Sequence, residues 1–129
     1  MTILVADDNA FSREVMRELL EASGHVILEA VNGRHALELI RRCGPDLVFL
    51  DLQMPLQDGF SVIRELRNEG RFQALPVVAV TASAMMGDRE RVIAAGFDSY
   101  IPKPIDLCEV EAQVEALGAR SGIGRQTPL

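Results

Sequence analysis

The stretch LVFLDLQMP, residues 47–55, decides the fold class because a run of apolar residues leads directly into a carboxylate. Residues 47–50 are all apolar, which is typical of a strand that is buried on both faces. Such a strand should end in a turn or in something equally apolar, but this one ends in Asp51. The acid at the end of a buried strand therefore needs an explanation, which the other segments of the sequence supply.

Four more segments with strand character alternate with helical patterns along the chain. They are residues 3–6, 26–28, 77–81 and 100–104. Apolar residues recur at helical spacing between them, and a glycine often follows the last turn of a helix. Strands that are apolar throughout need helices over both faces. With right-handed crossovers, the pattern predicts an α/β fold, namely a (βα)5 doubly wound domain with a five-stranded parallel sheet.

The C-terminal part of the chain is expected to hold one last helix and a tail. Asp106 can cap that helix, with Glu109 three residues on as its partner in a capping box. Residues 118–129 are rich in glycine and show little periodicity, which indicates a flexible tail or the start of a linker. We therefore expect one domain over residues 1–117.

Length and composition exclude several classes of protein. The chain has 129 residues, which suits one domain, and its formal net charge of −6 argues against a nucleic-acid surface. It has no apolar run long enough to span a bilayer and no signal peptide, so we expect a cytoplasmic protein without membrane insertion. Cys43 and Cys108 lack metal-ligand spacing and are expected to be free thiols.

Polar side chains stand at the ends of four predicted strands. Asp7 and Asp8 end the first strand, Asp51 the third, Thr81 the fourth and Lys103 the fifth. Parallel strands put their carboxyl ends at one edge of the sheet, where doubly wound folds bind ligands. Taken singly, each of these residues is ordinary for a strand end, a turn or a helix cap. Their joint placement favours a functional site.

Three carboxylates in one crevice would repel each other. At ~5 Å and an effective dielectric constant of ~20, each pair costs about 3 kcal/mol, so protons or a cation must relieve the repulsion. Hard oxygen ligands favour Mg²⁺, which also takes phosphate as a co-ligand. Lys103 adds a positive charge and Thr81 a hydroxyl donor. The set predicts phosphoryl transfer to an aspartate, where positioning and charge stabilisation do most of the catalysis.

At these residues the sequence closely resembles the receiver domain of bacterial-type two-component response regulators. The matching pieces are ADDN, LDLQMPLQDGF, VTA and YIPKP, and the resemblance covers roughly residues 2–117. It implies a flavodoxin-like fold with strand order 2-1-3-4-5. No output domain follows residue 117, and Met1 directly precedes the first strand, so we expect a stand-alone receiver or one cut from a longer chain at its tail.

The resemblance also implies a role for each residue of the site. Asp51 would accept a phosphoryl group from a histidine kinase or a histidine phosphotransfer protein. Asp8 and Asp51 would bind Mg²⁺ through their side chains, Gln53 through its backbone carbonyl and Asp7 through water. Lys103 would pair with the acceptor carboxylate and then with the phosphoryl oxygens. Such a protein catalyses its own aspartyl phosphorylation and dephosphorylation and has no separate enzymatic output.

Signal output is expected to depend on residues beyond the acceptor. The resemblance implies that Thr81 and Tyr100 form a switch pair and that Lys103-Pro104 is a cis peptide. A downstream protein would bind the face built by the helix within residues 84–95, the fifth strand and the last helix.

The lifetime of the phosphorylated state is expected to depend on two further side chains. Gln53 and Ser83 stand two residues after Asp51 and Thr81 and are predicted to contact water near the phosphoryl group.

Three other functions fit parts of the pattern. An aspartyl phosphatase of the haloacid dehalogenase type needs a second acid two residues after the nucleophile, where this chain has Gln53. A flavodoxin-like flavin binder would need a first loop that accepts phosphate, but DDNAF carries negative charge. A pure interaction module with the same fold typically lacks one of the acids or the lysine, and this chain keeps all of them.

Overall fold

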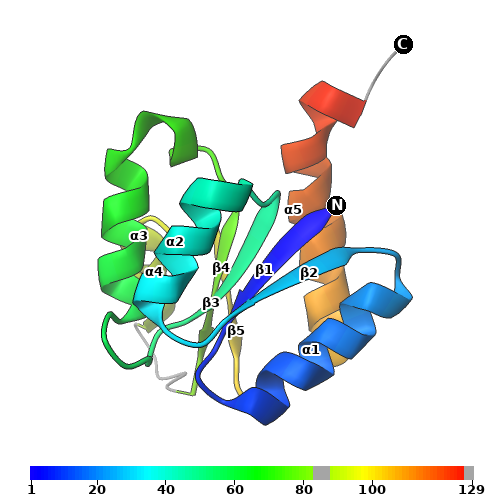
Figure 1. Cartoon of the computed structure of the whole chain (residues 1–129), viewed down its shortest axis with the longest axis horizontal. Coiled ribbons are helices and arrows are strands. Elements are labelled where there is room, and N and C mark those ends of the chain that lie inside the picture. The colour runs from blue at the N-terminus through cyan, green and yellow to red at the C-terminus, as the bar shows by residue number, and fades with distance from the viewer. Residues whose placement is uncertain (83–87, 127–129) are drawn as a thin grey trace.

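The computed structural model describes residues 1–82 and 88–126, and in this part of the chain five strands alternate with helices (Figure 1). The strands are β1 (Thr2–Ala6), β2 (Val26–Ala30), β3 (Leu47–Asp51), β4 (Val77–Thr81) and β5 (Ser99–Pro102). The helices are α1 (Ala10–Ala22), α2 (Gly33–Cys43), α3 (Gly59–Asn68), the short 3-10 helix η1 (Gly70–Phe72), α4 (Asp88–Ala95) and α5 (Leu107–Gln126).

The sheet is parallel throughout and has the strand order β2-β1-β3-β4-β5, which confirms the predicted flavodoxin-like topology. The chain first steps from β1 outward to β2 and then builds β3, β4 and β5 on the other side. The order therefore reverses between β1 and β3. Asp7 directly follows β1 and Asp51 is the last residue of β3, so both acids lie at this switch point, where such folds bind ligands.

Helices cover both faces of the sheet, as the continuous apolar strands predict. Figure 1 shows α2, α3 and α4 on one side of the sheet and α1 and α5 on the other. A hydrophobic core lies on each face of the sheet, and alternate residues of β3 point into one or the other. Leu50 packs with the side chains of α2 and α3, and Phe49 packs with those of α1 and α5. Each such side chain contributes about 1.5–3 kcal/mol through burial.

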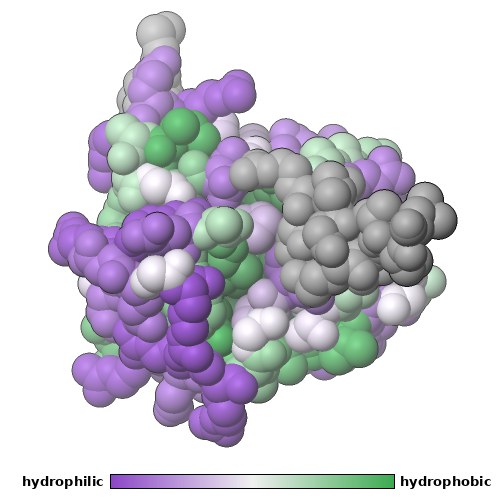
Figure 2. All heavy atoms as spheres, turned by 90° about the horizontal axis from the view of Figure 1, so that it is seen from above, coloured by the Kyte–Doolittle hydropathy of each residue, from purple (hydrophilic) through white to green (hydrophobic). Residues whose placement is uncertain are grey.

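The outer faces of α2 and α3 are polar, so these two helices are amphipathic. In Figure 2 hydrophilic side chains gather on the side of the molecule that carries α2 and α3. Arg41 of α2 forms ion pairs there with Glu65 of α3 and with Glu69 just after α3. These exposed pairs contribute little to stability, because water and salt screen them.

Two glycines let the loop after β3 pack tightly. A Cβ on Gly33, the first residue of α2, would lie 1.9 Å from the carbonyl oxygen of Gln57. A Cβ on Gly59, the first residue of α3, would lie 2.8 Å from the carbonyl oxygen of Asp51. Only glycine fits at both contacts, and together they fix the path of residues 52–58 beside the acidic edge.

Two elements extend further than the sequence pattern predicts. β2 continues through Glu29 to Ala30 because all five of its residues pair in register with β1. α5 continues to Gln126, whereas the pattern predicts a tail from residue 118. Residues 118–126 contain three glycines, each costing about 1 kcal/mol in a helix, but no proline that would end it. The domain boundary at residue 117 stays a prediction.

No helix in the described residues, 1–82 and 88–126, is long and apolar enough to cross a membrane.

Candidate functional site

Three carboxylates meet at the carboxyl edge of the sheet. One oxygen each from Asp7, Asp8 and Asp51 lies within 4.8 Å of the other two. Asp7 and Asp51 are buried, at 3% and 4% exposure, and Asp8 is exposed. The cluster exists because β1 and β3 are neighbours in the sheet and end side by side. This answers why a buried strand ends in an acid: the acid faces a shared polar site.

Lys103 joins two of these acids. Its Nζ lies 3.1 Å from Oδ2 of Asp7 and 3.1 Å from Oδ2 of Asp51. The backbone N–H of Lys103 donates to the carbonyl oxygen of Thr81 at 2.7 Å, which ties the end of β5 to the end of β4. The Lys103–Pro104 peptide bond is cis. The lysine thus brings one positive charge to a cluster of three negative charges.

The environment raises the pKa of Asp51 to about 6. Burial is the largest cause, and the negative charge of Asp7 adds to it. The backbone N–H of Gln53, 3.0 Å from Oδ1, and the ammonium of Lys103 both lower the pKa but do not outweigh burial. Burial also lowers the pKa of Lys103, but its bonds to Asp7 and Asp51 raise it by more, so the lysine stays charged.

The raised pKa of Asp51 describes a buried carboxylate whose charge is costly at this site. At neutral pH Asp51 is mostly ionised, yet its negative charge is poorly compensated. A group that brings positive charge, such as a divalent cation, is therefore favoured at this site.

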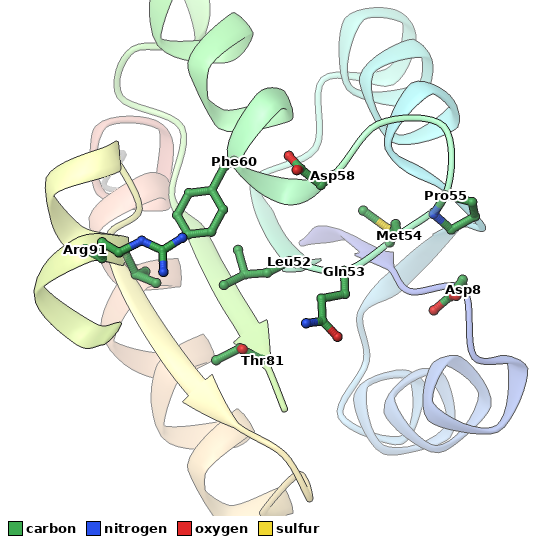
Figure 3. A pocket seen from close by; sticks show the side chains of 10 residues that line it. Asp8, Leu52, Gln53, Met54, Pro55, Asp58, Phe60, Thr81 and Arg91 are labelled. Carbon is green, nitrogen blue, oxygen red and sulfur yellow. The ribbon is translucent and has the colours of Figure 1, made fainter. Parts of the chain in front are cut away.

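A cavity of about 650 Å³ opens beside the acidic cluster. Figure 3 shows Asp8 at one end and Arg91 with Phe60 at the other, with Gln53 and Thr81 between them. Its remaining lining residues are Leu52, Met54, Pro55, Asp58 and Val92. The cavity thus leads from Asp8 of the acidic cluster toward α3 and α4.

The predicted switch and tuning residues occupy different surroundings. Thr81 is buried at the end of β4, and Gln53 lies exposed on the loop after β3. Tyr100 is half-buried, pairs with Ala79 in the sheet and packs against the core under α2, α3 and α4. Ser83 lies outside the described residues.

The sequence pattern does not predict one contact to the acids, which Arg13 makes with Asp7. Nη1 of Arg13, on α1, donates to the carbonyl oxygen of Asp7 at 2.7 Å, and its Nε donates to Glu29 on β2. In the sequence both residues look like solvated charges. Only the register of β2 against β1 brings Glu29 to this place.

Comparisons with known proteins match this fold and site. The model of the response regulator receiver domain matches residues 3–115. The polar-differentiation response regulator DivK of Brucella anthropi is 39% identical over 106 residues, covering 82% of this chain and 86% of that protein.

Solved structures of receiver domains have the same fold as this chain. The receiver domain of Francisella response regulator 1452 superposes with a TM-score of 0.87 at 28% identity, covering 93% of this chain and 98% of that one. The receiver domain of sensor histidine kinase PA1611 from Pseudomonas aeruginosa PAO1 superposes with a TM-score of 0.81 at 30% identity, covering 91% of this chain and 97% of that one. That structure has a magnesium ion coordinated in its active-site cleft.

Fold and site together define an α/β protein of the phosphoacceptor class. The chain belongs to the response regulator receiver domain family, the receivers of two-component signalling. This membership overturns the phosphatase and flavin-binding alternatives.

Proposed function

We propose that Asp51 is the residue of this receiver that accepts the phosphoryl group. The observation that carries the proposal is its central position: β3 lies between β1 and β4, so Asp51 alone of the three acids adjoins both the acidic end of β1 and Thr81 at the end of β4. Lys103, directly after β5, contacts the same carboxylate. Cation ligands, ammonium and hydroxyl therefore surround one candidate nucleophile.

The chemistry is a displacement at phosphorus. One carboxylate oxygen of Asp51 attacks the phosphorus of a phosphohistidine, the P–N bond breaks, and the imidazole leaves and takes up a proton from water. The product is an aspartyl phosphate with about −1.5 to −2 charge on the new group. Lys103, 3.1 Å from the acceptor carboxylate, is placed to offset part of that charge.

The donor set fits Mg²⁺. Carboxylate oxygens from three residues lie within 4.8 Å of one another, and hard oxygen ligands are those that Mg²⁺ prefers. We expect the side chains of Asp8 and Asp51 and the backbone carbonyl of Gln53 to bind it directly and Asp7 to bind it through water. The magnesium ion in the similar PA1611 receiver domain supports this assignment. When bound, the metal supplies positive charge to the phosphoryl oxygens.

Histidine kinases or histidine phosphotransfer proteins are the donors of receiver domains. For output, we propose that Thr81 and Tyr100 relay phosphorylation to a face formed by α4, β5 and α5, which binds a downstream protein in the cytoplasm. Gln53 and Ser83 are proposed to set the lifetime of the phosphorylated state, which the domain itself hydrolyses.

Labelling with acetyl phosphate tests the proposal. We expect the wild-type protein to gain one phosphoryl group with Mg²⁺ and none in excess EDTA, as measured by intact mass. A protein that is never labelled would be a pure interaction module. Equal labelling in EDTA would contradict the metal site.

A further inference from the structure

The backbone of Asp7 is held on both sides. Its N–H donates to the carbonyl oxygen of Ala30 at 3.1 Å, and its carbonyl oxygen accepts from Nη1 of Arg13 at 2.7 Å. The first bond ties Asp7 to the end of β2. The second ties it to α1, the helix that starts three residues later.

Arg13 is itself oriented by β2. Its Nε donates to Oε1 of Glu29 at 3.3 Å, and the side chain is only 15% exposed. Oε2 of Glu29 accepts from Nη1 of Arg17 at 2.8 Å, so the carboxylate is fixed from two positions on α1. Glu29 directly precedes Ala30, so neighbouring residues of one strand hold Asp7, one directly and the other through Arg13.

This arrangement bears on Asp8. The carbonyl of Asp7 and the N–H of Asp8 belong to one planar peptide unit. A guanidinium that fixes the carbonyl therefore fixes the direction in which the chain enters Asp8. Asp8 is exposed, so its backbone is the main constraint on where its carboxylate points.

We propose that Arg13, oriented by Glu29, is a positioning residue for the divalent-cation site of Asp7, Asp8 and Asp51. This inference rests on the proposed function, in which those acids bind Mg²⁺. The charge of Arg13 and its positioning role predict opposite changes in Mg²⁺ affinity when Arg13 is replaced. A positive charge near a cation site repels the cation, so its removal should tighten binding if charge were all that mattered. A positioning role predicts weaker binding.

The test is the Mg²⁺ affinity of the full chain, measured by calorimetric or NMR titration, for wild type, Arg13→Met and Arg17→Ala. Arg13→Met keeps the aliphatic stem, and we expect at least about tenfold weaker binding, the usual cost of losing an outer-shell partner. Arg17→Ala removes the same charge from the same carboxylate without touching Asp7. We expect its affinity to stay within about twofold of wild type, as for an exposed ion pair.

Arg13→Lys, which keeps the charge and one donor group, should recover part of the loss and serves as the second variant if Arg13→Met does not fold. NMR spectra without metal check that each variant is folded. Unchanged or tighter binding in Arg13→Met, or an equal loss in Arg17→Ala, would overturn the inference. A wild type that binds no Mg²⁺ would instead overturn the metal site itself and the inference with it.

Discussion

The ammonium of Lys103 lies 3.1 Å from Oδ2 of Asp51 and at the same distance from Oδ2 of Asp7. Lys103, which directly follows β5, thus bridges two buried acids, one directly after β1 and one at the end of β3. The two contacts join the ends of three strands at the edge where the site lies, and the contact with Asp51 spans 52 residues in sequence. Under the proposed function, the contact with Asp51 orients the acceptor carboxylate and supplies positive charge for the phosphoryl group.

Replacing Lys103 by methionine should therefore lower stability as well as phosphorylation. Without metal at pH about 8, two buried carboxylates lose their cation, and we expect a loss on the order of 2–3 kcal/mol. This is below the ~3–5 kcal/mol for a fully buried pair because Lys103 is 23% exposed. Urea unfolding measures the loss, and added Mg²⁺ should recover part of it. Equal stability of Lys103→Met and wild type would contradict the bridge.

The raised pKa of Asp51 predicts a pH dependence of stability in EDTA. Because the pKa rises from 3.8 to about 6 on folding, the folded state binds more protons between these values, and stability falls as pH rises through this window. The full effect is about 2–3 kcal/mol, at 1.36 kcal/mol per pKa unit. Asp51→Asn removes the titrating group, so its stability relative to wild type should increase from pH about 4 to 7. Parallel stability profiles would show that Asp51 is not perturbed.

Gly33→Ala should destabilise the protein by moving the loop after β3. The new Cβ would lie 1.9 Å from the carbonyl oxygen of Gln57, so the loop or α2 must shift, and overpacking of this kind costs about 1–3 kcal/mol. Gly70→Ala is the matched control, since nothing lies within 4 Å of its added Cβ, and it should stay within ~0.5 kcal/mol of wild type. Equal stability of the two variants, measured by thermal unfolding, would contradict the packing.

Thr81→Ala tests the route of the signal. We expect the variant to accept a phosphoryl group, because the carboxylates and Lys103 remain, but to leave the face of α4, β5 and α5 in its resting state. NMR spectra with and without beryllofluoride measure this. Chemical-shift changes of wild-type size across residues 88–106 in the variant would rule out Thr81 as the switch.

The fold was predictable from the sequence because its signals are local. Apolar strand segments without alternation require a sheet covered on both faces, and the structure has that sheet. The meeting of Asp7, Asp51 and Lys103 was predictable too, because parallel strands end at one edge.

Other features depend on geometry that no local pattern encodes. The contact of Arg13 with Asp7 requires the angle of α1 and the register of β2. The continuation of α5 to Gln126 goes against the glycine content of that segment.

The central claim, that Asp51 takes the phosphoryl group, is tested most directly by the intact mass of Asp51→Asn after incubation with a phosphohistidine donor and Mg²⁺. Asparagine has nearly the same shape as aspartate but is not a nucleophile here, so the fold should persist. We expect one phosphoryl group on the wild type and none on the folded variant. A stoichiometric phosphoryl group on Asp51→Asn would contradict the account.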